Sequence, residues 1–303
     1  MTDEITARGI ILNVYPQGEN GKRLDVLTDR FGKLCIFASG AAKTGSKLIG
    51  ALRPMTAAEF MLIRGRSSYR LHTLKVMNTF EAVSTGDYEN YCLAMYVLET
   101  AGYFSQEGMP EEDAKRLLNL MYLTLEKLGE LQPGLPGAEQ CAEKRQPAEQ
   151  RTVGQSTAEQ RIAEPRTVGQ RAAEYHAAGL VTAIYELRLL MQEGIASERP
   201  PVDCTANAEA LWKRTLSVRL SQLFSTAPVN GRARAECENP ADADNRDRID
   251  ADGSDTGENT SVPAASQETF EKKDAESFAR AVGALFKKQV PHEFRSLKVL
   301  REI

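Results

Sequence analysis

The sequence lacks the features on which several large classes of protein depend. It has no apolar run of about 18 residues, so it predicts no membrane-spanning helix. Its first residues, MTDEITARG, are acidic and polar, unlike a secretory signal peptide. The five cysteines are scattered and odd in number, which argues against a disulfide framework and predicts a reducing, cytoplasmic location.

The motifs of common enzymes and metal sites are missing as well. The three histidines form no H-E-x-x-H motif, and the chain has no C-x-x-C, G-x-S-x-G or strand-borne G-x-G-x-x-G motif. The acidic stretch DADNRDRIDADG does not have the spacing of a calcium-binding loop. We therefore predict a protein that is not an enzyme, with no catalytic residues and no cofactor.

Charge is distributed unevenly along the chain. Residues 1–75 hold twelve Lys or Arg against six Asp or Glu, a net charge of +6. Because the whole chain carries −4, the remainder carries −10. A basic module joined to an acidic remainder points to a polyanionic partner, although surface charge also drifts along many chains without function.

The hydrophobic pattern changes along the chain from strand-like to helical. Residues 1–80 contain five short β-type segments with polar turns, which predicts a small closed barrel: ARGIILNVYP, RLDVLTDR, GKLCIFASG, TAAEFMLIRG and YRLHTLKVMNTF. From about Asp87 the apolar residues recur at helical spacing, as in Tyr91, Met95 and Leu98. These stripes are interpreted as buried faces of a helical domain.

Two segments fit neither pattern. Residues 132–172 contain no aromatic residue and few large aliphatic residues, and they hold a short duplication, AEQRTVGQ and AEPRTVGQ. Residues 226–269 are acidic and rich in Pro, Gly, Asn and Ser. Because neither can bury much apolar surface, both are predicted to be disordered insertions.

The stretch ASGAAKTGSKLIG leaves three interpretations open. Gly40 and Gly45 have the spacing of a phosphate-binding loop, but Ser46 and Lys47 stand in the reverse order for one. A nucleotide hydrolase that uses the Gly40–Lys47 loop is therefore the alternative function. The other interpretations are a solvated loop and a basic loop that contacts nucleic acid.

The order of several short motifs resembles the RecO family of bacterial recombination mediators. The first half matches in a G-I-V-L strand, a Gly-Glu segment, a G-K strand, a G-A-x-x-x-x-S loop, L-x-P and G-R-x-x-Y-x-L, here at 9–12, 18–24, 32–33, 40–46, 52–54 and 65–71. In the second half, YELRLL (185–190) and EFRSLKVLREI (293–303) resemble two helices of the family. The resemblance covers about 220 residues and leaves out the two insertions.

This resemblance implies an α+β fold, with an OB-fold barrel followed by an all-helical domain. The expected division is 1–80 for the DNA-binding barrel, 81–131, 173–225 and 270–303 for the three parts of the helical domain, and 132–172 and 226–269 for the insertions. It implies binding of single- and double-stranded DNA and annealing of complementary strands in the cytoplasm, at the nucleoid. The implied partners are RecR and the tail of single-strand-binding protein. The resemblance also implies that the protein helps to load the RecA recombinase on single-stranded DNA that is coated with single-strand-binding protein.

We expect the barrel to contact DNA through cations and aromatic rings. The candidate residues are Arg23, Lys33, Lys43, Lys47, Arg64, Arg66 and Arg70 for phosphates and Tyr69 for base stacking. Arg8 is a weaker candidate, and Phe37 is either a stacking ring or part of the core. A different hypothesis is a helical scaffold whose barrel binds only protein.

The resemblance fails at one place. Many family members carry a four-cysteine zinc module after the FELRLL helix, and this chain reads PPVDCTANAEALW there. Cys204 stands at the first ligand position, but Asn207 stands at the second, and Cys237 lies in the acidic insertion. A structural zinc needs four converging ligands, so we predict that the site is lost and that no metal is bound.

Overall fold

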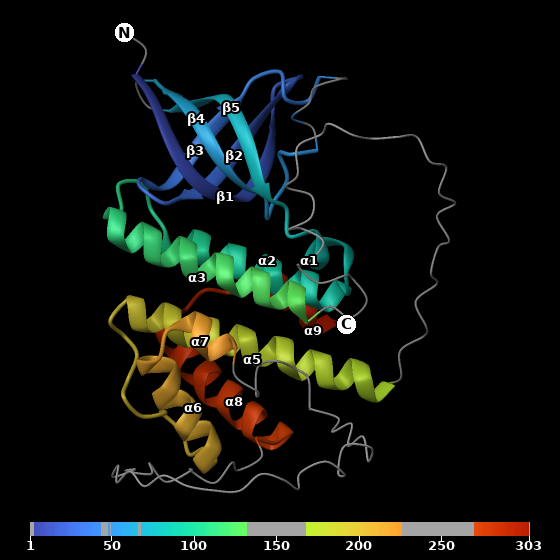
Figure 1. The fold of residues 1–303 in the computed structure, drawn as a ribbon, viewed down its shortest axis with the longest axis vertical. Coiled ribbons are helices and arrows are strands. Elements are labelled where there is room, and N and C mark those ends of the chain that lie inside the picture. The colour runs from blue at the N-terminus through green and yellow to red at the C-terminus, as the bar shows by residue number, and fades with distance from the viewer. Residues whose placement is uncertain are drawn as a thin grey trace, which may run out of the picture.

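The amino-terminal part of the chain is a closed barrel of five strands (Figure 1). The computed structural model describes residues 3–43, 48, 50–65, 68–131, 168–225 and 270–302. The strands lie in the order β1-β2-β3-β5-β4, antiparallel except for the β3–β5 pair. Their bounds are Asp3–Gln17 (β1), Gly21–Thr28 (β2), Gly32–Ala38 (β3), Ala57–Arg64 (β4) and Tyr69–Asn78 (β5). The predicted barrel and its five strands are confirmed.

The barrel closes because its strands alternate in polarity. In β3, Leu34 and Ile36 point inward and are fully buried, whereas Lys33, Cys35 and Phe37 are half-buried on the other face. The inward residues of all five strands form one largely apolar cluster. Burial of that cluster fixes which side chains of each strand remain on the outside.

The β2–β3 turn docks the barrel on the helical domain. Gly32 has a φ of +68°, and a Cβ there would collide with the carbonyl oxygen of Gln106. Gly32 also forms an isolated antiparallel bridge to Glu107, and the N–H of Gly108 donates to the carbonyl of Phe31 at 3.1 Å. Only glycine satisfies both the backbone angle and the close approach at this point.

The helices form two layers beneath the barrel in Figure 1. The layer next to the barrel contains α1 (Glu81–Thr85), α2 (Tyr88–Phe104), α3 (Glu111–Glu130) and, behind, α9 (Arg295–Glu302). The second layer contains α5 (Val168–Gln192), α6 (Ala206–Ser217), α7 (Leu220–Phe224) and α8 (Lys272–Gln289). Their apolar faces share one core, which also takes in Ile10, Leu12 and Leu27 of the barrel.

Buried hydroxyl and carboxyl groups tie α5 to α2. The Tyr96 hydroxyl donates to Oε1 of Glu186 at 2.5 Å, and Tyr185 and Thr100 share a hydrogen bond of 2.9 Å. Burial raises the pKa of Glu186 to about 7, against the opposing effect of the Tyr96 hydrogen bond. The YELRLL stretch therefore joins helices in this fold.

One predicted boundary is wrong. Helix α5 begins at Val168, inside the segment 132–172 that was assigned to an insertion. The assignment rested on the lack of aromatic residues, but alanine-rich sequence such as that of 168–178 has high helix propensity. The remainder of that segment, 132–167, and the whole of 226–269 lie outside the described residues.

Candidate nucleic-acid interface

Four side chains from four strands form a row across the outside of the barrel. Tyr15 of β1 lies opposite Arg23 of β2, and Arg23 lies opposite Phe37 of β3. Phe37 in turn lies beside Arg70 of β5. We call Tyr15, Arg23, Phe37 and Arg70 the outer row. Neighbouring strands are about 4.8 Å apart, so the row spans roughly 14 Å and alternates aromatic rings with guanidinium groups.

Arg23 lies at the centre of the outer row. Its guanidinium carbon is 4.3 Å from the centroid of the Tyr15 ring, and its side chain is 40% exposed. Asp25 stands 4.0 Å from its Nε, so the ion pair is loose. A guanidinium that rests on an aromatic ring presents a planar cation, which contacts phosphates and also stacks on bases.

The rest of the outer row is open to a ligand to different degrees. Arg70 is exposed, Tyr15 is 39% exposed and Phe37 is half-buried. Cys35 precedes Phe37 by two residues on the same outer face of β3, and burial together with the nearby Asp25 raises the pKa of its thiol. The thiol therefore stays neutral and leaves the two arginines as the charges of the row.

The glycine-rich loop begins beside the outer row. A shallow hollow of about 200 Å³ lies there, lined by Gln17, Asn20, Gly21, Lys22, Phe37, Ala38, Ser39 and Gly40. The Lys22 ammonium donates to the carbonyl of Leu52 at 3.1 Å, which holds the later part of the loop segment. Lys43 is exposed after the turn in which its N–H donates to the Gly40 carbonyl. Lys47 lies outside the described residues.

The same segment counts against a phosphate-binding loop of the hydrolase type. That loop needs a helix directly after it, because the helix amino terminus contacts the phosphates. Residues 50–56 form turns and lead into β4, with no helix in the described part of the loop segment. The nucleotide-hydrolase alternative therefore lacks its main structural element there.

The structure brings only some of the predicted contact residues together. Arg64 is exposed at the end of β4, directly after Ile63, which lies opposite Arg70. Because Arg64 itself lies opposite the inward-facing Tyr69, it does not belong to the outer row, whereas Arg66 lies outside the described residues. Arg8 is on the β1–β4 side of the barrel and forms an ion pair of 3.8 Å with Glu59.

Two predicted residues have other roles. The Lys33 ammonium donates to the carbonyl of Gly102 at 2.7 Å, so it joins the barrel to α2, at the opposite end of β3 from Phe37. Tyr69 is 9% exposed and packs in the barrel core, because it lies beside the inward-pointing Ile36. We therefore remove both from the candidate interface. Tyr15 was missed, although pairing the first two strands in hairpin register would have placed it opposite Arg23.

The described residues around Cys204, where the zinc module was expected, are joined by hydrogen bonds. Among the described residues, no three His, Cys, Asp or Glu side chains converge on a common point. Instead, Asn207 Nδ2 donates to Oδ2 of the buried Asp274 at 3.0 Å, and the Glu271 N–H donates to the same atom at 2.9 Å. The N–H of Thr205 donates to Ser277 Oγ at 3.2 Å. Hydrogen bonds thus join the starts of α6 and α8.

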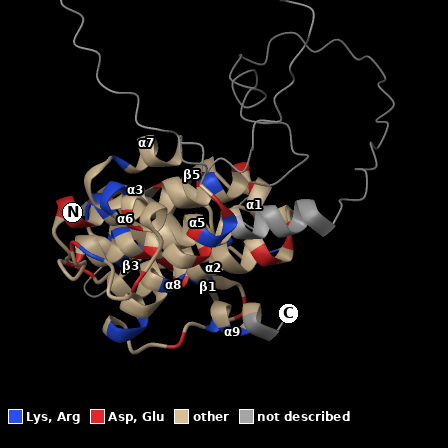
Figure 2. Cartoon of the chain, turned by 90° about the horizontal axis from the view of Figure 1, so that it is seen from below, with Lys and Arg blue, Asp and Glu red and all other residues tan. Residues whose placement is uncertain are grey.

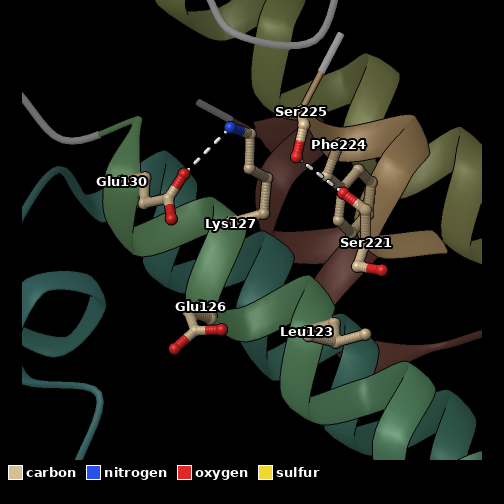
Figure 3. A pocket seen from close by; sticks show the side chains of 7 residues that line it. All are labelled: Leu123, Glu126, Lys127, Glu130, Ser221, Phe224 and Ser225. Atoms are coloured by element: carbon tan, nitrogen blue, oxygen red, sulfur yellow. Dashed lines mark hydrogen bonds and ion pairs between the residues drawn. The ribbon is translucent and has the colours of Figure 1, made fainter.

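A second hollow, between α3 and α7, does not suit an acidic peptide (Figure 3). It has a volume of about 320 Å³ and is lined by Leu123, Glu126, Lys127, Glu130, Ser221, Phe224 and Ser225. Lys127 pairs with Glu130 at 2.9 Å, and burial together with Glu130 raises the pKa of Glu126. Two carboxylates at the hollow disfavour the acidic tail of single-strand-binding protein there.

Comparison with known proteins agrees with the barrel. Residues 1–80 match the family model described as "Recombination protein O N terminal". The chain is similar to "DNA repair protein RecO" of Clostridium perfringens, with 33% identity over 95 residues, and of Desulforudis audaxviator, with 34% identity over 127 residues. These alignments cover 31% and 42% of this chain and 38% and 49% of those proteins, so the chain matches less than half the length of each of these two relatives. Among the described helices, none is long and apolar enough to cross a membrane.

Proposed function

Because residues 1–80 match the amino-terminal model of the RecO family, we propose that this chain is a DNA-repair protein of that family whose barrel binds DNA through the outer row. The observation that carries the proposal is the alternation of Tyr15, Arg23, Phe37 and Arg70 across four strands. Aromatic rings between cations are the usual chemistry of single-strand binding, because rings stack on any base and cations neutralise any phosphate. Binding should therefore tolerate any sequence.

The proposed activity is annealing of complementary strands and mediation of recombination. Bound cations lower the repulsion between two strands and raise their rate of encounter, and this needs no nucleotide hydrolysis. RecR, the tail of single-strand-binding protein and, indirectly, RecA are the proposed partners. We propose in addition that the protein acts without a metal, because the hydrogen bonds of Asp274 already join α6 to α8.

A salt titration tests the proposed function most directly. Fluorescence anisotropy of labelled oligo-dT with the full chain should show affinity falling roughly 10²- to 10³-fold between 50 and 200 mM salt if four to six phosphates are contacted. The same titration with duplex DNA should fall with salt as well. A flat salt response, or no binding at low salt, would rule the proposal out. ATP hydrolysis above background would favour the hydrolase.

A further inference from the structure

A second aromatic surface lies at the end of α2, away from the outer row. The Tyr103 and His292 rings stack with centroids 5.0 Å apart and planes 25° apart. Phe294, which is buried, meets both edge-on, at 5.9 Å from Tyr103 and 4.8 Å from His292. Tyr103 is 47% exposed and His292 is also exposed. We call this stacked pair the Tyr103–His292 platform.

Cations flank the Tyr103–His292 platform on both sides along the chain. Lys287 and Lys288 occupy the last turn of α8, and Arg295 is the first residue of α9. All three are exposed, and none has an ion pair with another described residue. The nearby Glu293 pairs with Lys298 at 3.2 Å. Figure 2 shows blue segments at the end of α8 and the start of α9, joined by the short connection that carries His292.

The Tyr103–His292 platform is held in place by a contact between α2 and α9 and by a contact from the barrel. The N–H of Ser296 donates to Oε2 of Glu99 at 3.0 Å, which fixes the start of α9 on α2. Lys33 of the barrel holds the carbonyl of Gly102, directly before Tyr103. Lys33 and Phe37 are four positions apart on β3, which is roughly 13 Å along the strand, and the platform lies beyond the Lys33 end.

An exposed ring pair beside unpaired cations matches a ligand that is both planar and anionic. A single nucleic-acid strand has this character, because its bases stack on rings and its phosphates meet cations. An acidic peptide would use the cations but not the open ring face. We propose that the Tyr103–His292 platform is a second contact for single-stranded nucleic acid, which holds one strand while the outer row holds the other.

This inference rests on the proposed function and extends it to annealing. Two separated contacts allow one chain to bring complementary strands together, whereas a single contact makes the strands compete. The full chain should therefore bind two oligo-dT strands at saturation and low salt. Tyr103→Ala/His292→Ala should bind one, and should slow annealing of complementary strands by about fivefold or more, the effect of losing one stacked base.

Tyr88→Ala is the matched control, because Tyr88 lies on the same helix and is also exposed and stacked, on Tyr91 at 6.4 Å. It should anneal at the wild-type rate. Lys287→Glu/Lys288→Glu tests the cations without touching the ring core, and should also slow annealing and weaken its dependence on salt. Circular dichroism of each variant identifies any loss of fold.

The outcomes separate this inference from the proposed function. If wild-type protein binds no DNA, the proposed function fails first. If wild-type protein binds and anneals, and both platform variants anneal at the wild-type rate with unchanged stoichiometry, the second contact is overturned. If the folded platform variants lose affinity for the first strand as severely as they lose annealing, there is one continuous site and the two-strand arrangement is also wrong.

Discussion

The barrel and the helical domain place their charged groups in opposite ways. In the barrel the interior is largely apolar, and Arg23 and Arg70 stand on the outer face. In the helical domain two carboxyl groups, Glu186 and Asp274, lie inside and accept hydrogen bonds. A buried carboxylate is stable only with its partners, whereas an exposed cation keeps its hydration and its freedom to bind. The comparison indicates that inner carboxyls maintain the fold and outer cations serve the ligand.

The largest effect should come from breaking the inner contacts of Asp274. Asp274→Ala removes the buried carboxylate that accepts two charge-assisted hydrogen bonds, from the half-buried Asn207 amide and from the Glu271 N–H, so we expect a loss of about 3 kcal/mol in the free energy of unfolding. Urea denaturation followed by the helical circular-dichroism signal measures it. Glu276→Ala, at an exposed position with an ion pair of 3.7 Å to Lys272, should change stability by no more than about 0.5 kcal/mol. An equal effect of the two variants would contradict the assigned role of Asp274.

A smaller loss should follow when the two regions are forced apart. In Gly32→Val, the side chain meets the Gln106 carbonyl and the residue must adopt a positive φ, so we expect about 2 kcal/mol of destabilisation. Gly18→Val is the control, since Gly18 also has a positive φ, +61°, but a Cβ there meets no atom within 4 Å. If Gly18→Val lowers the free energy of unfolding in urea by as much as Gly32→Val, backbone strain alone explains the loss and the contact between barrel and helices does not.

The outer cations should affect binding and leave the fold unchanged. We expect Arg23→Glu/Arg70→Glu to weaken oligo-dT binding by roughly 10- to 100-fold at low salt, because two attractive charges become repulsive. Arg8→Glu reverses a charge on the barrel outside the outer row. It is a partial control, because the new carboxylate also replaces the ion pair of Arg8 with Glu59 by a repulsion. Anisotropy should show a clearly smaller effect for it. Equal losses in the two variants would mean that only the net charge of the barrel matters.

The smallest effect should be a dependence of stability on pH that arises from Glu186. Its pKa is about 7 in the folded protein and lower when unfolded, so the folded state holds the extra proton between these values. Protonated Glu186 therefore stabilises the folded state at about pH 5. This stabilisation falls by roughly 1–2 kcal/mol as the pH rises to about 7. Glu186→Gln should remove this dependence in urea titrations at several pH values. An identical pH profile for variant and wild type would show that Glu186 is not the source.

Much of the architecture was predictable from local patterns. Alternating polarity in GKLCIFA and helical spacing in Tyr91, Met95 and Leu98 indicate the barrel and the helices, because burial of one face is the main force on each element. The start of α5 was misplaced because helix propensity without aromatic residues was undervalued. The site was predicted less well: Arg23 and Arg70 lie in the outer row, but Lys33 and Tyr69 do not.

Five strands, a set of amphipathic helices and an excess of cations in the first quarter of the chain follow from residue type and short-range spacing alone. Which side chains share a surface depends on how the strands and helices pair in three dimensions. The register of β1 on β2 puts Tyr15 under Arg23, and the parallel closure of β3 on β5 sets Tyr69 inside and Arg70 outside. Such pairings join segments far apart in the chain, and a shift of one residue would turn each of these side chains to the other face.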